Sequence, residues 1–306
     1  MNRVLLLGVP TESPMTLTAN ALARLGMDFF FWDQQQVSKS TCFVQSNEMG
    51  LSGYLEGPDG RVALEEVVGA YTRLASWAAL PELQQRHADD PRVIHACKTH
   101  CALEEWLELT PARVVNRTYA NASNNSKPYQ ALLIRRRFYI PETLVSSDSE
   151  TILAFCEQHP RTIVKSISGE RSIVTEFTRR DRDRLSLLKH CPIQVQEWVD
   201  GFDVRVHVAG RHVFATRVHS AAIDYRYDRS PQGAQFNSFE LPDDVEDACV
   251  RLTEEMDLGL AGLDLRFSPD GRVYCFEVNP SPAYSVFESA TGQQISHAIA
   301  LHLAGL

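Results

Sequence analysis

The feature that most constrains this fold is a hairpin pattern between Gly262 and Ser281, GLDLRFSPDGRVYCFEVNPS. The dipeptide Asp270-Gly271 stands between two runs in which apolar and polar residues alternate, and this is the strongest short-range hairpin signal that a sequence offers. With Asp270 and Gly271 as the turn, residue 268 lies opposite 273, 266 opposite 275, and 264 opposite 277. The pattern therefore predicts an antiparallel strand pair with two different faces.

One face of the predicted hairpin is apolar and the other is polar. The apolar face, which we expect to pack on a core, consists of Leu263, Leu265, Phe267, Tyr274, Phe276 and Val278. The polar face carries Asp264, Arg266, Glu277 and Asn279. Asp264 and Glu277 stand directly opposite each other, where cross-strand Cβ atoms are only about 5 Å apart, so their negative charges destabilise the sheet unless something offsets them.

Three partners could offset this repulsion: a proton shared by the two carboxylates, the guanidinium of Arg266, or a divalent cation. Two carboxylates and the amide oxygen of Asn279 on one rigid surface suit magnesium, a hard cation that takes oxygen ligands and usually keeps substrate phosphates as the rest. A solvated polar strand face without metal is the alternative. The hairpin alone does not decide between them.

Charge, hydropathy and cysteine usage narrow the class of protein. A net charge of −9 argues against a nucleic-acid-binding protein, because contacts to phosphates need a basic surface. The opening MNRVLLLGVP has too short an apolar run for a signal peptide, and the chain has no run of about 18 apolar residues that would span a membrane. Seven scattered cysteines without a C-x-x-C motif are typical of reduced thiols, so we expect a cytoplasmic protein.

Strand and helix patterns divide the chain into three parts. Arg3–Gly8 and Asp28–Trp32 read as strands on either side of a helix, which predicts an α/β domain with a parallel sheet. The small polar residues of YANASNNSK, which ends at Lys127, cannot build a core and mark the first boundary. We therefore expect an N-terminal α/β domain over residues 1–120, a second unit over 121–200 and a third over 201–306.

A pair of lysines and a loop of small residues form a candidate phosphate site. The second lysine ends an apolar strand, TIVK, and leads into the loop SISGERS. Backbone N–H groups and positive charge in such a loop can close over phosphates. The residues of this group are Lys127, Lys165, Ser168, Gly169 and Arg171. Because the loop has one glycine, an ordinary strand-to-strand turn with solvated charges is the alternative.

A second candidate group lies in IQVQEWVDGFDVRVHV, residues 193–208, which stops at Asp200-Gly201 and resumes as a strand. This is the pattern of an inter-domain hinge, in which Gln196, the backbone of Glu197–Val199, and Asp203 could read an adenine edge and a ribose. A charged edge strand is the alternative.

The third group consists of Arg205, Arg217 and Arg266. The alternation in DVRVHV places Asp203 and Arg205 on one strand face, opposite the valines. An arginine in a cleft beside carboxylates usually forms an ion pair, and its other use is bidentate binding of phosphate or carboxylate groups.

Taken in chain order, these features resemble the ATP-grasp superfamily over about residues 120–285. The order is a lysine, a second lysine with a loop, a hinge, arginines on strands, and then D-x(12)-E-x-N followed by P-S-P. The resemblance implies an α/β chain in which ATP lies between two α+β subdomains after an N-terminal α/β domain. It also implies a reaction in which a carboxylate takes the γ-phosphate of ATP and a nucleophile then displaces phosphate from the acyl phosphate.

The resemblance implies ATP and Mg²⁺ as cofactors and assigns the site residues to three groups. Phosphate and nucleotide binding falls to Lys127, Lys165, Ser168, Gly169, Arg171, Gln196, Glu197, Val199 and Asp203. The implied magnesium ligands are Asp264, Glu277 and Asn279. Arg205 and Arg217 match arginines near the γ-phosphate and the acceptor carboxylate, and Arg266 is expected to tune the site.

Four segments resemble a narrower group, the graspetide or microviridin-type ligases, which are relatives of RimK-type glutamate ligases. They are SKPYQALLIRRRFYIPETLV, VKSISGERSIV, QEWVDGFDVRVHVAG and CFEVNPSPAYSVFESATGQQI. This resemblance implies that the chain macrocyclises a ribosomal precursor peptide through ω-ester or ω-amide bonds.

Two alternatives to macrocyclisation are a RimK-like ligase that joins an amino acid to a small molecule or protein C-terminus, and a catalytically silent nucleotide-gated binding module. The expected partner is a precursor peptide or small acceptor with a carboxylate and a nucleophile, without nucleic acid or membrane. The sequence leaves a homodimer open.

Overall fold

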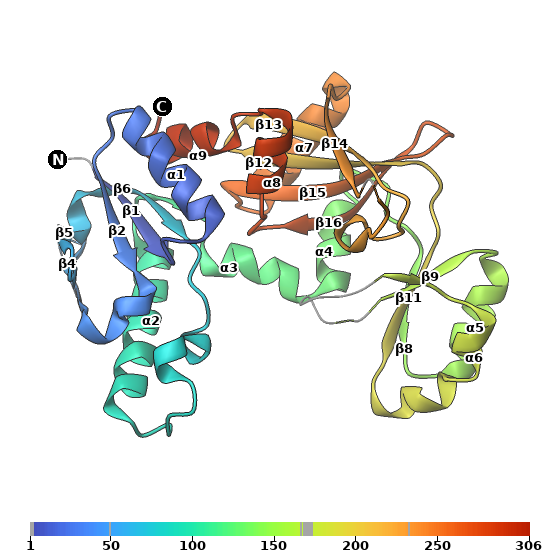
Figure 1. Ribbon diagram of the computed structural model, residues 1–306, viewed down its shortest axis with the longest axis horizontal. Coiled ribbons are helices and arrows are strands. Elements are labelled where there is room, and N and C mark those ends of the chain that lie inside the picture. The colour runs from blue at the N-terminus through green and yellow to red at the C-terminus, as the bar shows by residue number, and fades with distance from the viewer. Residues whose placement is uncertain (1–2, 49, 166, 168–173, 232) are drawn as a thin grey trace.

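The structure is a computed structural model of the 306-residue chain and describes residues 3–48, 50–165, 167, 174–231 and 233–306. Figure 1 shows an N-terminal domain at one end, a small sheet with its helices at the other, and a long antiparallel sheet between them. None of the helices in the described ranges combines the length and hydropathy needed to cross a membrane.

A parallel sheet organises the N-terminal domain. Its strands are β1 (Arg3–Gly8), β2 (Phe29–Asp33), β6 (Val67–Thr72) and β7 (Arg113–Val115), in the order β2-β1-β6-β7. Residues 4–7 of β1 are fully buried, as a parallel strand covered on both faces requires. Helix α2 (Pro91–Leu109) covers one face, and α1 (Ser13–Arg24) and α9 (Ile295–Ala304) cover the other. The predicted parallel α/β start is confirmed.

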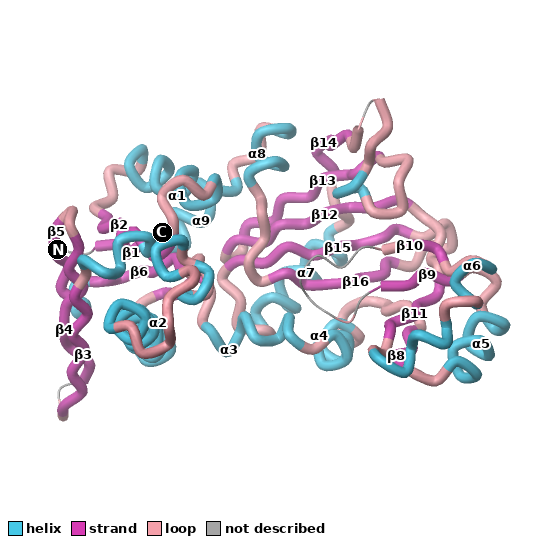
Figure 2. The backbone as a smooth tube through the Cα atoms, turned by 60° about the horizontal axis from the view of Figure 1, so that its bottom comes forward, coloured by secondary structure: helices cyan, strands magenta, loops and turns pink. Residues whose placement is uncertain are grey.

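An antiparallel ribbon completes this domain. It contains β3 (Thr41–Asn47), β4 (Gly50–Gly57) and β5 (Gly60–Ala63), and Figure 2 shows it projecting beyond the parallel sheet. Short 3-10 helices lie in the connections between the elements of the described chain: Gln34–Lys39, Leu64–Glu66, Trp77–Ala79, Pro81–Leu83, Ala122–Asn125, Leu185–His190 and Tyr225–Tyr227.

A small antiparallel sheet follows the linker. Its strands are β8 (Thr143–Ser146), β9 (Thr162–Lys165), β10 (Thr175–Glu176) and β11 (Ile193–Glu197), in the order β10-β9-β11-β8. Helix α5 (Ser149–Gln158) contributes Ile152 to the core of this unit, and α6 (Arg179–Arg182) follows β10. The TIVK strand that ends at Lys165 is found where it was expected.

The long sheet has five antiparallel strands among the described residues, in the order β14-β13-β12-β15-β16. They are β12 (Phe202–Ala209), β13 (His212–His219), β14 (Gln235–Phe239), β15 (Leu260–Phe267) and β16 (Val273–Asn279). Helix α7 (Asp243–Glu255) packs on the face that carries Val204 and Val206. Helices α3 (Thr118–Asn121) and α4 (Lys127–Ile134) lead to the outer edge at β16, and α8 (Ser285–Thr291) precedes α9. We keep the boundaries at 120/121 and 200/201 as a proposal, supported by the division of the strands into these sheets.

The predicted hairpin forms, and Asp264 lies opposite Glu277 as expected. The turn, however, is a three-residue loop: Ser268 N–H donates to the carbonyl of Arg272 at 2.9 Å, and Gly271 adopts the positive φ of 85° that such a loop uses. The predicted pairs 268/273 and 266/275 are therefore wrong. A bulge at Phe276 adds one residue to β16 and restores the register at the carboxylate pair.

The side chain of Asn116, just after β7, fastens the N-terminal domain to the long sheet. Its amide group donates to the carbonyls of Leu260 (2.6 Å) and Pro280 (2.5 Å), and its oxygen accepts from the N–H groups of Gly259 and Leu260. Figure 1 also shows α9, near the C-terminus, lying beside α1, near the N-terminus. Both ends of the chain thus pack on the same domain.

Candidate active site

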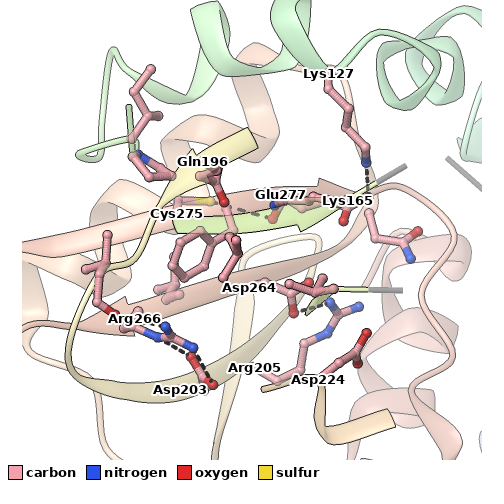
Figure 3. Close-up of a pocket in the computed structure, with 18 of the residues that line it drawn as sticks. Lys127, Lys165, Gln196, Asp203, Arg205, Asp224, Asp264, Arg266, Cys275 and Glu277 are labelled. Atoms are coloured by element: carbon pink, nitrogen blue, oxygen red, sulfur yellow. Dashed lines mark hydrogen bonds and ion pairs between the residues drawn. The ribbon is translucent and has the colours of Figure 1, made fainter. Parts of the chain in front are cut away.

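A cavity of about 1040 Å³ lies between the small sheet and the long sheet, with α4 along one side. Figure 3 shows that strands far apart in the sequence contribute its charged side chains. The sequence-predicted residues that line it are Lys127, Lys165, Gln196, Glu197, Val199, Asp203, Arg205, Asp264, Arg266, Glu277 and Asn279. Ser168, Gly169 and Arg171 of the predicted phosphate loop lie outside the described residues.

Two separate cations offset the repulsion between the facing carboxylates. Nη1 of Arg205 donates to Oδ1 of Asp264 at 2.6 Å, and Nζ of Lys127 donates to Oε1 of Glu277. Arg266 pairs instead with Asp203. Two carboxylates and two cationic side chains thus lie on one wall of the cavity. If these ion pairs separate, the carboxylates can bind a metal ion and the cationic groups can bind an anion.

Arg205 reaches Asp264 because glycine occupies position 262. A Cβ added to Gly262 would lie 2.1 Å from Nη2 of Arg205. The side chain of Arg205 is 7% exposed, and its strand neighbours Val204 and Val206 point to the core on the opposite face. Gly262 therefore provides the space in which a buried, carboxylate-paired arginine sits.

Helix α4 places Lys127 on the edge strand β16. The helix starts at the Ser126 cap, whose hydroxyl accepts from Tyr129 N–H. One turn later, the buried side chain of Gln130 donates to the carbonyl of Val278 (2.7 Å) and accepts from its N–H (3.1 Å). Gln130 thus makes the two backbone hydrogen bonds of Val278 that a neighbouring strand would otherwise make. These bonds also fix the position of the helix that carries Lys127.

The bulge in β16 changes which side chains face the cavity. Cys275 borders the cavity but is 1% exposed and belongs to the core below the sheet. Phe276 and the adjacent Glu277 line the cavity, and Phe276 is not part of that core. The prediction that Phe276 belongs to the apolar core face is therefore wrong. Its ring centre lies 5.9 Å from Nζ of Lys165 and 5.1 Å from the guanidinium carbon of Arg266.

Lys165 projects into the cavity from the end of β9. Burial disfavours its charged form and lowers its pKa from 10.5 to about 8, although the nearby carboxylate of Glu277 acts in the opposite direction. A buried ammonium that lacks full compensation is a ready partner for an anionic ligand such as a phosphate.

The end of β11 and the hinge segment that follows it offer unused polar groups to the cavity. The amide of Gln196 donates to Thr143 Oγ1 at 2.8 Å, and its buried Oε1 has no hydrogen-bond partner among the described residues. Val199 is buried, and within the same residues its N–H has no acceptor, while its carbonyl accepts from Arg266 at 2.9 Å. An unpaired donor and acceptor at a hinge suit the edge of a heterocyclic base.

Asp203 and Arg266 form a two-point ion pair at 2.7 and 2.9 Å. The same arginine lies between the rings of Trp198 and Phe276 and bonds to the hinge carbonyl of Val199. Arg266 therefore orients the hinge and the aspartate together. Each carboxylate oxygen of Asp203 retains a further lone pair for a hydroxyl donor.

Arg217 does not reach this cavity. It pairs across the sheet with Val204, on the face covered by α7, and its guanidinium lies 4.2 Å from the ring centre of Phe202. The expectation that Arg217 lies near the γ-phosphate and the acceptor is therefore not supported by its position. The strand alternation in β13 alone would have indicated this face.

Sequence reasoning missed a further ion pair at the cavity. Arg226 donates to Asp224 through Nε (2.8 Å) and Nη2 (2.6 Å), and both side chains line the cavity with Tyr225 between them. Burial, together with the nearby charge of Asp264, raises the pKa of the Tyr225 hydroxyl. These residues lie in an irregular loop after β13, where no periodicity indicates which side chains turn inward.

The residues present fit ATP and a divalent cation. The cavity has a hinge with unpaired polar groups at one end and cationic side chains beside paired carboxylates at the other. Hard cations prefer carboxylate and amide oxygens, which Asp264, Glu277 and Asn279 supply. The amide oxygen of Asn279 accepts from Ser281 N–H at 2.8 Å, which orients it beside Glu277.

Comparison with known proteins identifies the same region. The RimK-like ATP-grasp domain matches residues 122–303. A probable alpha-L-glutamate ligase 1 of Shewanella amazonensis is 26% identical over 211 residues, covering 65% of this chain and 69% of that protein. A probable alpha-L-glutamate ligase of Pseudomonas aeruginosa PAO1 is 25% identical over 215 residues, covering 66% and 71%.

Solved structures extend the similarity to the whole chain. The macrocyclase MdnC from Microcystis aeruginosa, bound with precursor peptide MdnA, gives a TM-score of 0.82 at 20% identity, with 100% of both chains covered. A RiPP-associated ATP-grasp ligase of Chryseobacterium gregarium, in complex with ADP and a leader and core peptide, gives 0.85 at 19% identity, covering 100% of this chain and 97% of that one. At these identities the likeness shows the fold. From the family match, the chain belongs to the RimK-like ATP-grasp family and is an ATP-dependent ligase.

Proposed function

We propose that this ligase uses ATP and Mg²⁺ to macrocyclise a ribosomal precursor peptide. A side-chain carboxylate of the peptide would be activated as an acyl phosphate and joined to a hydroxyl or amine of the same peptide. The observation that carries this proposal is the wall on which Asp264 and Glu277 face each other, each paired with a separate cation.

Charge neutralisation is the main chemical task of such a site, because a carboxylate must approach a polyphosphate. Lys127, Lys165 and Arg205 supply positive charge around the position of the transferred phosphoryl group. In-line phosphoryl transfer needs little beyond positioning and electrostatic stabilisation, so these side chains suffice without a protein nucleophile.

The metal would be held by Asp264, Glu277 and Asn279, and it would supply Lewis-acid stabilisation of the phosphate oxygens. Lys127 and Arg205 then become free to contact phosphate rather than carboxylate. The hinge would receive the adenine through Gln196 and Val199, and Asp203 would accept from the ribose.

Arg226 is the better candidate for the acceptor role that the sequence analysis gave to Arg217. It lines the cavity, it is held by the buried Asp224, and its planar guanidinium suits a carboxylate of the substrate. We therefore place the carboxylate-bearing segment of the peptide near Arg226.

A peptide substrate is supported by the closeness of the structural match. MdnC, which was solved with a precursor peptide, matches the whole chain with a TM-score of 0.82, whereas a D-Ala:D-Ser ligase that also matches almost the whole chain gives 0.58. The alternative, addition of an amino acid to a small molecule or protein C-terminus, is favoured by the names of the curated relatives.

We also propose a cytoplasmic location, supported by the seven free cysteines. A homodimer stays a prediction.

The metal assignment is tested with Glu277→Gln, which keeps the shape of the side chain and removes its charge. We expect phosphate release to fall by at least about a hundredfold, because one of the few metal ligands is lost, while the thermal midpoint changes little. Asp270→Asn, in the exposed hairpin loop, is the matched control and should retain full turnover. Normal turnover in the Glu277 variant would contradict the proposal that Glu277 binds the metal.

Mass spectrometry of a short acidic peptide encoded beside this protein and co-expressed with it separates the candidate functions. Loss of one water per bond formed supports macrocyclisation, and gain of an amino-acid residue supports the glutamate-ligase alternative. A protein that binds ATP but consumes none with any peptide or amino acid would instead be a nucleotide-gated binding module.

A further inference from the structure

The loop that follows β16, residues 280–284, is held by the N-terminal domain at three places. Asn116 bonds to the carbonyl of Pro280. Nη1 of Arg73 donates to Oγ of Ser281 at 2.9 Å and to the carbonyl of Pro282 at 3.3 Å. The hydroxyl of Tyr284 donates to the carbonyl of Pro14 at 2.7 Å. The loop therefore packs on three parts of the N-terminal domain: the carboxyl end of β6, the carboxyl end of β7 and the start of α1.

The same loop borders the candidate metal ligands. Ser281 is bonded on both sides, since its hydroxyl accepts from Arg73 and its N–H donates to Oδ1 of Asn279 at 2.8 Å. Pro282 is buried, and a Cβ added to Gly262 would lie 2.8 Å from its Cβ and 2.1 Å from Arg205. A displacement of the loop would therefore reach both Asn279 and the arginine that pairs with Asp264.

The side chain of Arg73 is fixed by its contacts within the N-terminal domain. Its side chain is 12% exposed, and its Nε and Nη2 both donate to Oε1 of Glu12, at 2.6 and 2.5 Å. Its own N–H donates to the carbonyl of Leu7, which ties it to the end of β1. With Nε and Nη2 used by Glu12, Nη1 is directed at the loop.

We propose that Arg73 is a positioning residue for the metal site: it holds Ser281 and thereby the amide oxygen of Asn279. This inference rests on the proposed function, which places the cation on Asp264, Glu277 and Asn279. It also makes the N-terminal domain part of the metal site, although the family match starts only at residue 122. Partners that orient metal ligands typically contribute tenfold to a hundredfold in metal affinity or activity.

The test measures Mn²⁺ binding to the ADP-saturated protein by electron paramagnetic resonance, with Mn²⁺ as a probe for Mg²⁺. Arg73→Ala is expected to weaken Mn²⁺ binding about tenfold, while the affinity for ADP measured without metal stays unchanged. Arg73→Lys, which can still reach one acceptor in the loop, should recover part of the loss. A merely structural role would lower the thermal midpoint without this selective loss.

Arg3→Ala is the matched control, because it removes another ion pair of the same sheet, Arg3 with Asp28 at 2.7 Å, at the opposite end of β1. Its Mn²⁺ affinity should equal that of the wild type. Should Arg73→Ala fail to fold, Ser281→Ala removes the same contact from the exposed loop side and should weaken Mn²⁺ binding in the same direction.

The outcomes separate this inference from the proposed function. If the wild type binds Mn²⁺ and Arg73→Ala, or Ser281→Ala in its place, binds it equally well, the positioning role of Arg73 is overturned and the metal site stands. If the wild type with ADP does not bind Mn²⁺, the metal assignment itself fails, and the inference fails with it.

Discussion

The lowered pKa of Lys165 predicts that nucleotide affinity depends on pH. Burial is the largest cause of the shift from 10.5 to about 8; Glu277 and Asp264 oppose it, and Lys127 and Arg266 add to it. The charged ammonium is the form that attracts phosphate. Raising the pH through 8 removes this charge from the free enzyme, whereas ordinary lysines keep theirs to much higher pH.

The size of the effect follows from the titration. With a pKa of about 8, roughly nine-tenths of Lys165 is charged at pH 7 and roughly one-tenth at pH 9, so affinity for a nucleotide triphosphate should fall about tenfold over this range. Unfolding does not explain such a loss. The unfolded chain binds more protons at Lys165 between pH 8 and 10.5, so this residue makes the protein more stable, not less, as pH rises through that window.

Calorimetric titration with the non-hydrolysable analogue AMPPNP from pH 6 to pH 9.5 measures this dependence without any acceptor substrate. The wild type should show a decline that begins near pH 8. Lys165→Arg keeps its charge throughout and should give a flat profile. The reasoning is refuted if wild-type affinity is constant to pH 9.5, or if the arginine variant declines at the same pH.

Three substitutions test other parts of the arrangement. Gln130→Ala leaves the N–H and carbonyl of an edge residue of β16 unsatisfied, so we expect a loss of about 2–4 kcal/mol in stability and faster amide exchange in β16, measured by mass spectrometry. Gly262→Ala should displace Arg205 and lower ATP turnover about a hundredfold in a phosphate-release assay. Arg217→Ala should lower the free energy of unfolding by about 1 kcal/mol, because the contact with the ring of Phe202 is lost, and should leave turnover unchanged. A large fall in turnover would show that Arg217 belongs to the active site after all.

The features of the fold that the sequence predicted depend on local signals. Alternation and a turn dipeptide predicted the hairpin, and an apolar run predicted the strand that ends at Lys165. The pairing of Asp264 with Glu277 was predicted correctly only because the longer loop and the bulge at Phe276 shift the register by one residue each and cancel. The order of lysine, hinge, arginine and carboxylates is read directly from the sequence, and the family resemblance based on it implies the roles of these residues. Most of the predicted residues come together in one cavity, because strand faces are set by a period of two.

The features that were missed depend on contacts between distant segments. Nothing local to α4 indicates that Gln130 pairs with a strand about 150 residues later, or that Arg73 reaches the loop after β16. Asp224 and Arg226 come from an irregular loop, where alternation gives no face. The bulge at Phe276 was missed because residues 273–276, VYCF, are all apolar, so the alternation does not show where its phase changes.

The extra residue in β16 makes this strand unusually tolerant of a deletion. Removing one residue from a regular strand moves every later side chain to the opposite face. Here, deletion of Phe276 would leave Leu265 opposite Cys275 and Asp264 opposite Glu277, in an unbroken ladder with every other side chain on its present face. The bulge is thus a removable insertion, and a chain that lacked it would keep its carboxylate pair while losing one ring from the cavity wall.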